Sequence, residues 1–339
     1  MDKVTSISVV IPSYNRVQEL KELLGSVLAQ KIYPNEVLIC EDNSPEKFNI
    51  QTMVDSFRTI FEKYKIKLTF IINETNLGYD KNLRKCIETA SSEWALIMGN
   101  DDLLLPEAIS EVKSYIAKNP KVNFISRSFL RFNTDIQKPI GFSSLSDKDI
   151  IYKSGVSEPK MIFRTAGFVG GLVVNVPFAR SLHTEEFDGS LYYQIYLAAS
   201  AFIGEGIGYI SKPIIGGRAD NPPMFGQAAD DKEVHVPGSY TARGRAAMWR
   251  GVLKIAKSVG EGSKIDLYTP LKHELTTRQS FHIFEMNAGQ SIKVNKELKK
   301  ELADLGLMNH PMPLMFYLIN CTLKSNSRFI YKAIRKIMQ

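Results

Sequence analysis

Residues 94–106 read WALIMGNDDLLLP, and the interpretation of the whole chain starts from this stretch. An apolar run breaks at Gly99, presents Asn100, Asp101 and Asp102, and then resumes. This pattern predicts a buried strand with paired acids at its carboxyl end, followed by a helix that begins near Pro106. Two adjacent carboxylates at a strand end favour a hard divalent cation. An ordinary Asn-Asp turn or helix cap uses the same residue types, so the rest of the chain must decide.

The preceding residues predict an α/β domain. Buried strands are expected at residues 6–12, 36–40 and 67–72, and helices at 17–30, at 49–64 and up to Ala90. This alternation predicts a doubly wound sheet, in which ligands gather at the carboxyl ends of the strands. Polar clusters follow three strands, at residues 13–16, 41–44 and 100–102. Neither a G-x-G-x-x-G nor a G-x-x-x-x-G-K-[ST] motif is present, which argues against a dinucleotide-binding Rossmann domain and a P-loop nucleotidase.

Length and composition are those of a folded protein without a membrane span. The chain has 339 residues, 44% hydrophobic and 23% charged, which is enough for an α/β core and an additional subdomain. No apolar run reaches the roughly 18 residues of a spanning helix. A strand pattern begins too early for a signal peptide, and Cys40, Cys86 and Cys321 have no metal-binding or disulfide spacing. We therefore expect a cytoplasmic protein.

The charge is unevenly distributed. Lys and Arg number 43 against 36 acids, a net charge of +7, and the last acid is Asp304. Five cations follow it: Lys324, Arg328, Lys332, Arg335 and Lys336. Without a nucleic-acid-reading motif we expect no nucleic-acid partner. Apolar residues opposite these cations are typical of a helix at an anionic membrane surface. A helix docked on its own domain, or in a homo-oligomer, would have the same pattern.

Four short motifs carry a family resemblance. They are VVIPSYNR at residues 9–16, EDNS at 41–44, NLG at 76–78, and GNDD at 99–102 with Leu105-Pro106. In order and spacing, over about the first 110 residues, the chain resembles the family 2 glycosyltransferases of the GT-A fold. The resemblance implies a mixed α/β sheet flanked by helices in a GT-A domain over residues 1–240. Residues 1–110 would bind a nucleotide-sugar, and residues 120–240 would form the acceptor half with a mobile loop at 219–240. A helical extension with the basic tail would fill residues 241–339.

The same resemblance assigns the donor-binding residues. Glu41 and Asp42 would contact the base and ribose, with Pro12, Tyr14 and Arg16 lining their pocket; Arg16 is also compatible with a surface helix cap. Lys81 and its neighbour Asn82 would face the donor, unless Lys81 lies on a solvated helix face. Asn100, at a position where the family usually has an acid, would also lie at the donor, and Asp101 would contact the ribose or a metal-bound water. Arg218, at the end of a late strand, would support the diphosphate.

A metal and a catalytic base are also implied. Asp102 would hold Mn²⁺ or Mg²⁺ across the donor diphosphate, and His235 would add a ligand unless it is simply an exposed loop residue. An inverting transferase needs a carboxylate to deprotonate the acceptor hydroxyl. We assign this role to Asp188, with Glu186 and then Glu185 behind it, although Asp188 is equally suited to cap the helix expected at 191–196. The family's Glu-Asp pair is missing there, and Tyr193-Gln194 takes its place. Gly170-Gly171 suits an acceptor-site turn or a plain bend.

These features together predict an inverting, metal-dependent glycosyltransferase. It would use a nucleotide-sugar, most simply a UDP-sugar, and act on a saccharide or lipid-linked saccharide in O-antigen or capsule synthesis. Its place would be peripheral, on the inner face of the cell membrane. Two alternatives remain. A sugar-phosphate nucleotidylyltransferase should carry a G-G-x-G-T-R-like loop after the first strand, where this chain has Pro12-Ser13-Tyr14-Asn15. A catalytically degenerate GT-A domain would serve as a scaffold.

Overall fold

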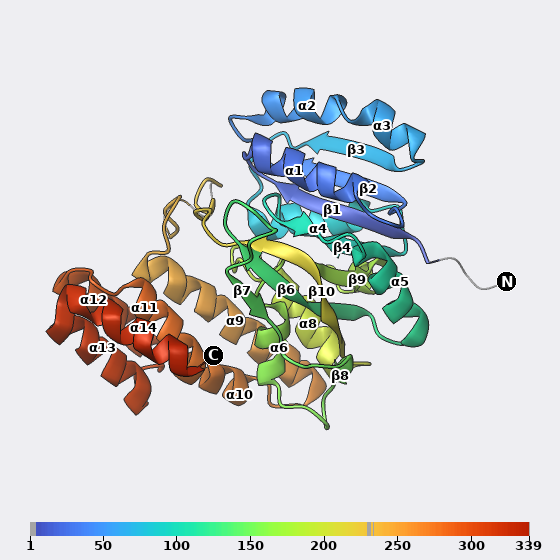
Figure 1. Ribbon diagram of the computed structural model, residues 1–339. Coiled ribbons are helices and arrows are strands. Elements are labelled where there is room, and N and C mark those ends of the chain that lie inside the picture. The colour runs from blue at the N-terminus through green and yellow to red at the C-terminus, as the bar shows by residue number, and fades with distance from the viewer. Residues whose placement is uncertain (1–4, 229–231, 233, 339) are drawn as a thin grey trace.

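The protein is described here by a computed structural model that covers residues 5–228, 232 and 234–338. Its main feature is a ten-stranded sheet with the order β3-β2-β1-β4-β9-β6-β10-β5, to which β7 adds on β6 and β8 on β10 (Figure 1). Helices flank the sheet, and the C-terminal helices gather to one side of it. The predicted mixed sheet with flanking helices and a helical C-terminal region is confirmed.

The first half of the sheet is parallel, as predicted. It consists of β1 (Ile7–Ser13), β2 (Glu36–Glu41), β3 (Lys67–Ile72) and β4 (Trp94–Ile97). Strands β1, β2 and β4 are almost entirely buried because helices cover both faces, which explains their continuous apolar runs. The connecting helices are α1 (Val17–Leu28), α2 (Lys47–Asp55), α3 (Arg58–Lys63) and α4 (Tyr79–Thr89). The single helix expected at 49–64 is interrupted at residues 56–57, where the Ser56 hydroxyl donates to the Met53 carbonyl.

The second half of the sheet is mixed. Its elements are β5 (Leu103–Leu104), α5 (Ala108–Lys118), β6 (Phe124–Phe132), β7 (Gly141–Ser143), β8 (Ile150–Tyr152), β9 (Leu172–Asn175) and β10 (Ile207–Arg218). Strand β9 runs antiparallel to both β4 and β6, and β10 runs parallel to β6. Residues 143–157, where the sequence indicates an irregular connection, contain β8, which pairs with β10. That pairing is supported by Asp149, whose carboxylate accepts from the Ser211 backbone N–H.

Helices complete the chain. They are α6 (Lys160–Ala166), α7 (Val176–Ser181), α8 (Tyr193–Ile203), α9 (Ala242–Ser263), α10 (Tyr268–Glu274), α11 (Ser280–Met286), α12 (Ile292–Asp304), α13 (Pro311–Leu323) and α14 (Ser327–Met338). The sequence has a helical pattern over residues 266–286, and within this range a π-helical turn at Leu275–Gln279 joins α10 to α11. One hydrophobic cluster extends from Val10 in β1 to Tyr331 in α14, so the helices beyond residue 240 share a core with the sheet.

The basic tail is a helix that docks on the protein itself along one side. Tyr331 of α14 is buried against Phe281 and Phe316, whereas Phe329 is 70% exposed. One side of the predicted amphipathic helix therefore packs on the protein's own helices, and the other side, with Phe329, faces outward. Within the described ranges, no helix is both long and apolar enough to cross a membrane.

Candidate active site

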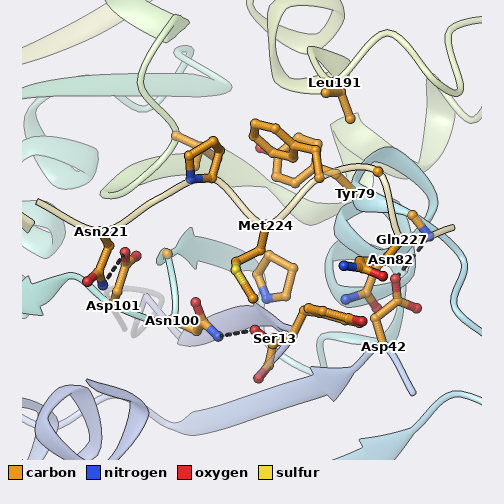
Figure 2. Close-up of a pocket in the computed structure, with 18 of the residues that line it drawn as sticks. Ser13, Asp42, Tyr79, Asn82, Asn100, Asp101, Leu191, Asn221, Met224 and Gln227 are labelled. Carbon is orange, nitrogen blue, oxygen red and sulfur yellow. Dashed lines mark hydrogen bonds between the residues drawn. The ribbon is translucent and has the colours of Figure 1, made fainter. Parts of the chain in front are cut away.

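A cavity of about 360 Å³ opens where β1, β2 and β4 end (Figure 2). The loops after these strands supply one wall, and residues 167–169, 191–194, 218–228 and 240–248 supply the rest. Nine residues singled out from the sequence line it: Pro12, Tyr14, Arg16, Asp42, Asn82, Asn100, Asp101, Asp102 and Arg218. The carboxyl ends of parallel strands meet at one edge, which is why motifs distant in sequence come together here.

Asp42 shapes the polar end of the cavity. One carboxylate oxygen accepts from the Asn73 side chain at 2.7 Å and from the Leu77 N–H at 2.8 Å, and the other accepts from the Gly78 N–H at 2.9 Å. Burial raises the pKa of Asp42 although these bonds oppose the shift. Burial, with the nearby charges of Glu41 and Asp42, also raises the pKa of Tyr14. Asp42 therefore fixes the 73–78 segment that forms the cavity wall.

Glu41 and Lys81 are not among the residues that line the cavity. Glu41 is fully buried, and one of its oxygens accepts from the Ser44 N–H at 2.9 Å, so it stabilises the turn after β2. Its burial raises its pKa. Beside Lys81, Asn82 does reach the cavity, and its amide donates to the Cys40 carbonyl at 2.9 Å.

Asn100 holds the loop after β1. Its amide nitrogen donates to the carbonyls of Tyr14, at 3.3 Å, and Asn15, at 3.2 Å, and its oxygen accepts from Arg16 at 3.4 Å. Asn15 and Arg16 both have left-handed backbones, with φ of 57° and 66°. A carboxylate could not donate to the two carbonyls, so an amide is the side chain that suits this position.

Asp101 and Arg16 form an ion pair at 2.5 Å inside the cavity. Both also bind the segment after β10: Asn221 donates to the Asp101 carboxylate at 3.0 Å, and Arg16 donates to the Pro222 carbonyl at 2.5 Å. In Figure 2 this segment, which carries Asn221, Met224 and Gln227, crosses the cavity above Asn100 and Ser13. The loop expected at 219–240 thus lies over the cavity in its described part.

Asp102 is 2% exposed and accepts from the Arg218 N–H at 3.0 Å. Burial, with Asp101 next to it, raises its pKa to about 8, although the Arg218 N–H and the charges of Arg127 and Arg16 oppose the shift. Two glycines make room for it, because a Cβ on Gly170 would lie 2.1 Å from the second carboxylate oxygen and one on Gly99 would lie 2.8 Å from it. Gly99 and Gly170 therefore accommodate this carboxylate, whereas a Cβ on Gly171 would lie 2.8 Å from the Arg127 Nε.

A divalent cation fits at Asp102 if the donor completes its ligands. Asp101 and Asp102 offer the hard carboxylate oxygens that Mg²⁺ and Mn²⁺ prefer, and glycines keep the space beside Asp102 open. Among the described residues, no group of three or more His, Cys, Asp and Glu side chains could hold a metal. His235 is buried against Phe225 and is not a lining residue, and burial lowers its pKa. The structure does not bring His235 together with Asp102 in the cavity lining.

Arg218 lines the cavity with its guanidinium already engaged. It donates to the carbonyls of Asp101, at 3.1 Å, and Asn133, at 3.0 Å, and to the Glu22 carboxylate at 2.6 Å. It also stacks on Phe132, with 4.7 Å to the ring centroid. These contacts fasten the end of β10 to the loop after β4.

Asp188 and Glu186 lie outside the cavity lining. Arg84 of α4 donates to both Asp188 carboxylate oxygens, at 2.5 and 3.0 Å, and Glu186 is a surface residue near Lys254. Asp80 performs the helix-capping role considered for Asp188: its carboxylate accepts from the N–H groups of Leu191 and Tyr193. At the start of α8, Gln194 lines the cavity and accepts from the Tyr79 hydroxyl at 3.2 Å.

Two arginines at the site, Arg127 and Arg245, were not predicted from the sequence. Arg127 of β6 is 3% exposed, lies 5.2 and 5.1 Å from the ring centroids of Phe129 and Phe168, and acts electrostatically on Asp102. Burial lowers its pKa to about 9. Arg245 reaches the cavity from α9. An arginine inside an apolar strand pattern, as in FISRSFLRF, was the available signal for Arg127; only the packing of α9 brings Arg245 here.

Comparisons with known proteins agree with this geometry. The family model for glycosyl transferase family 2 matches residues 8–167. An uncharacterized glycosyltransferase of Haemophilus influenzae is 33% identical over 119 residues, which are 35% of this chain and 37% of that protein. The abequosyltransferase RfbV of Salmonella typhimurium is 25% identical over 227 residues, 63% of this chain and 67% of its own. The fold matches the crystal structure of S. aureus TarS 1-349 in complex with UDP, with a TM-score of 0.60 at 15% identity, covering 98% of this chain and 92% of that one.

Proposed function

We propose that this chain, which belongs to the family 2 glycosyltransferases and has the GT-A fold, transfers a sugar from a nucleotide-sugar to a saccharide acceptor by direct displacement. The observation that carries the proposal is the single cavity in which four motifs meet: the loop after β1, Asp42 after β2, the 76–78 turn, and residues 99–102 after β4. Each lies at the carboxyl end of a strand, where this class of sheet binds ligands.

The donor is proposed to be a UDP-sugar. The part of the cavity around Tyr14, Asp42 and Asn82 offers a ring and polar side chains to a nucleoside. The relative of similar fold, TarS, has been crystallised with UDP, which supports this choice of nucleotide. The acceptor is proposed to be a saccharide, free or lipid-linked, in surface polysaccharide synthesis of the O-antigen or capsule type, a choice supported by the abequosyltransferase relative.

Asp102, assisted by Asp101, is proposed to hold Mn²⁺ or Mg²⁺. When bound there, the cation would neutralise the charge that develops on the departing nucleoside diphosphate. The chain's own residues prepare the site: Gly99 and Gly170 leave space at the Asp102 carboxylate, and the Arg218 N–H orients it. Asn100 holds the loop that presents Arg16 to the same end of the cavity.

Calorimetry with UDP, CDP and GDP, with and without Mn²⁺, tests this function. We expect one nucleotide to bind, more tightly with the metal, and slow hydrolysis of the matching nucleotide-sugar. Asp102→Asn should abolish the enhancement by the metal, while Asp304→Asn on the far helix α12 should not. A wild-type protein that binds none of the three nucleotides would refute the proposal.

Two features favour a second candidate, a GT-A domain that binds the donor without turning it over. Asn100 stands where the family usually has an acid, and Gln194 lines the cavity at the start of α8 in place of a carboxylate. A scaffold of this kind would bind the nucleotide in the titration. It would release no sugar from any nucleotide-sugar, with or without an acceptor lipid extract.

Contact with an anionic membrane surface through α13 and α14 is also proposed. Leu314, Met315 and Leu318 are 39–57% exposed on α13, a helix without a charged residue. Phe329 is exposed on α14, near the cation Lys332. Flotation with phosphatidylglycerol vesicles should fall in a Leu318→Gln/Phe329→Gln variant whose melting temperature is unchanged. If the wild type does not float but forms a dimer that the variant loses, the surface binds a second copy instead.

A further inference from the structure

Three arginines line the cavity, and they differ in how their charges are compensated. Arg16 is paired with the Asp101 carboxylate, and Arg218 with the Glu22 carboxylate. Arg245 has no carboxylate within ion-pair distance among the residues that the structure describes. Its contacts include the Tyr240 ring, 4.1 Å from the guanidinium carbon to the ring centroid, the Met286 sulfur, at 3.8 Å, and the Tyr192 hydroxyl. An aromatic face and a thioether hold the guanidinium in place without neutralising it.

The position of Arg245 in its helix is unfavourable for stability. Helix α9 begins after Thr241, whose hydroxyl accepts from the Gly244 N–H, and Arg245 follows within the first turn. Arg243 also lies in this turn, which contains no acidic residue. Cations near a helix N-terminus are repelled by the helix dipole, so a stabilising sequence would have an acid there. A half-buried arginine in this place is better explained by something that it binds.

The charge of Arg245 affects the pKa values of two residues at or near the cavity. It opposes the burial that raises the pKa of Tyr192, another cavity-lining residue, and it adds to the burial that lowers the pKa of His235. Around it the cavity wall is mostly apolar, with Tyr192, Phe225, Tyr240 and Met248. In such surroundings, a guanidinium with no carboxylate partner in the described part of the chain favours an anion with several oxygens, because its fork of N–H donors matches a phosphate.

We propose that Arg245 is a phosphate-binding residue of the cavity and binds a phosphate group of one of the substrates. The inference rests on the proposed function, since the phosphate would belong either to the donor's diphosphate or to a phosphate that carries the acceptor saccharide. Arg245 is more than 140 residues along the chain from the loops after β1 and β4. It reaches the same cavity only because α9 packs against α8 and the core of the sheet.

The test compares Arg245→Gln with Arg243→Gln, a matched control because Arg243 is exposed in the same turn and does not line the cavity. Calorimetry at constant ionic strength would use inorganic pyrophosphate, the tightest nucleoside diphosphate of the UDP, CDP and GDP panel, and its parent nucleoside. Melting curves check that the variants are folded. For a donor phosphate, Arg245→Gln should weaken the diphosphate by about tenfold or more, as expected for a lost charged hydrogen bond, and leave the nucleoside unchanged. Arg245→Lys should recover part of the loss.

For an acceptor phosphate, the nucleoside diphosphate should bind Arg245→Gln normally, while pyrophosphate binding measured with saturating nucleotide is lost. Unchanged binding of both ligands in Arg245→Gln would overturn the inference, as would equal losses in Arg243→Gln, which would indicate only a general charge effect. The proposed function can fail on its own. If the wild type binds pyrophosphate through Arg245 but binds no nucleoside diphosphate, the role of Arg245 is supported and the proposed nucleotide-sugar donor is refuted.

Discussion

Asn100→Asp tests whether the amide in the GNDD motif is a weakened metal ligand or a clamp on the neighbouring loop. If it replaced a missing acid, aspartate would strengthen metal and donor binding. The structure predicts the opposite, because the Asn100 amide donates to the Tyr14 and Asn15 carbonyls at 3.3 and 3.2 Å. Aspartate would lose both hydrogen bonds and place a negative charge beside two carbonyl oxygens. The left-handed Asn15-Arg16 turn, which aims Arg16 at Asp101, would then lose its support.

The magnitude follows from these contacts. Two neutral hydrogen bonds contribute roughly 1–3 kcal/mol together, and the long distances place this pair at the lower end. A new ion pair between the aspartate and the partly exposed Arg16 would stabilise the folded state by about 0–1 kcal/mol. Repulsion between the carboxylate and the carbonyls adds to the loss, so we expect the free energy of unfolding to fall by about 1–2 kcal/mol, a few degrees in melting temperature.

Urea denaturation and donor titration would measure the effect, with exposed Asn133→Asp as the charge-matched control and Asn100→Ala as the variant without the new charge. Asn100→Asp should be no more stable than Asn100→Ala, and its donor affinity should fall. An Asn100→Asp protein as stable as the wild type, with tighter binding of donor and metal, would refute the clamp.

Three further changes test other parts of the site. Gly170→Ala places a Cβ 2.1 Å from an Asp102 carboxylate oxygen and should sharply reduce metal-enhanced nucleotide binding in calorimetry. The control Gly25→Ala, whose Cβ in α1 would have nothing within 4 Å, should leave binding unchanged and stabilise the helix by about 1 kcal/mol. Equal nucleotide binding by the two variants would contradict the role given to the space beside Asp102. Burial raises the pKa of Asp102 from 3.8 to about 8, so between these pH values the folded state binds a proton that the unfolded state has lost. In metal-free buffer, the free energy of unfolding should therefore fall as the pH rises from about 4 to about 8. Asp102→Asn should lack this fall, and the same pH dependence in wild type and variant would contradict the raised pKa. Asp188→Ala removes the bidentate partner of Arg84, which is 7% exposed and keeps Glu185, only at 3.6 Å, and the Thr184 carbonyl, so it should cost about 3 kcal/mol of unfolding free energy while donor binding and turnover at low temperature persist. A folded variant with normal donor binding and no turnover would instead support Asp188 as the base.

Local pattern was sufficient for the first half of the fold. Strands β1, β2 and β4 are buried and largely apolar, and the helices between the strands have their own period, so the doubly wound sheet and the edge where ligands gather follow from short-range rules. The same reasoning located Tyr14, Asp42 and Asp102, because a polar side chain directly after a buried strand has little freedom in where it lies. The limits appear where a strand is short or paired far away: β8 joins the sheet only through β10, more than fifty residues later.

The partners of the polar residues were decided by the tertiary structure. Asp188, predicted as the base, has both its oxygens bound by Arg84, 104 residues earlier. Arg218, predicted to support the diphosphate, is engaged by Glu22 and two carbonyls. Asn100 reads as a lost acid until the loop after β1 comes within reach of its amide. Hydrogen bonds and ion pairs of this kind depend on atoms brought to about 3 Å by packing between distant elements, and no periodicity in the chain encodes them. The sequence by itself determined the sheet and the edge that carries the site; packing decided which side chains there remain available to a ligand.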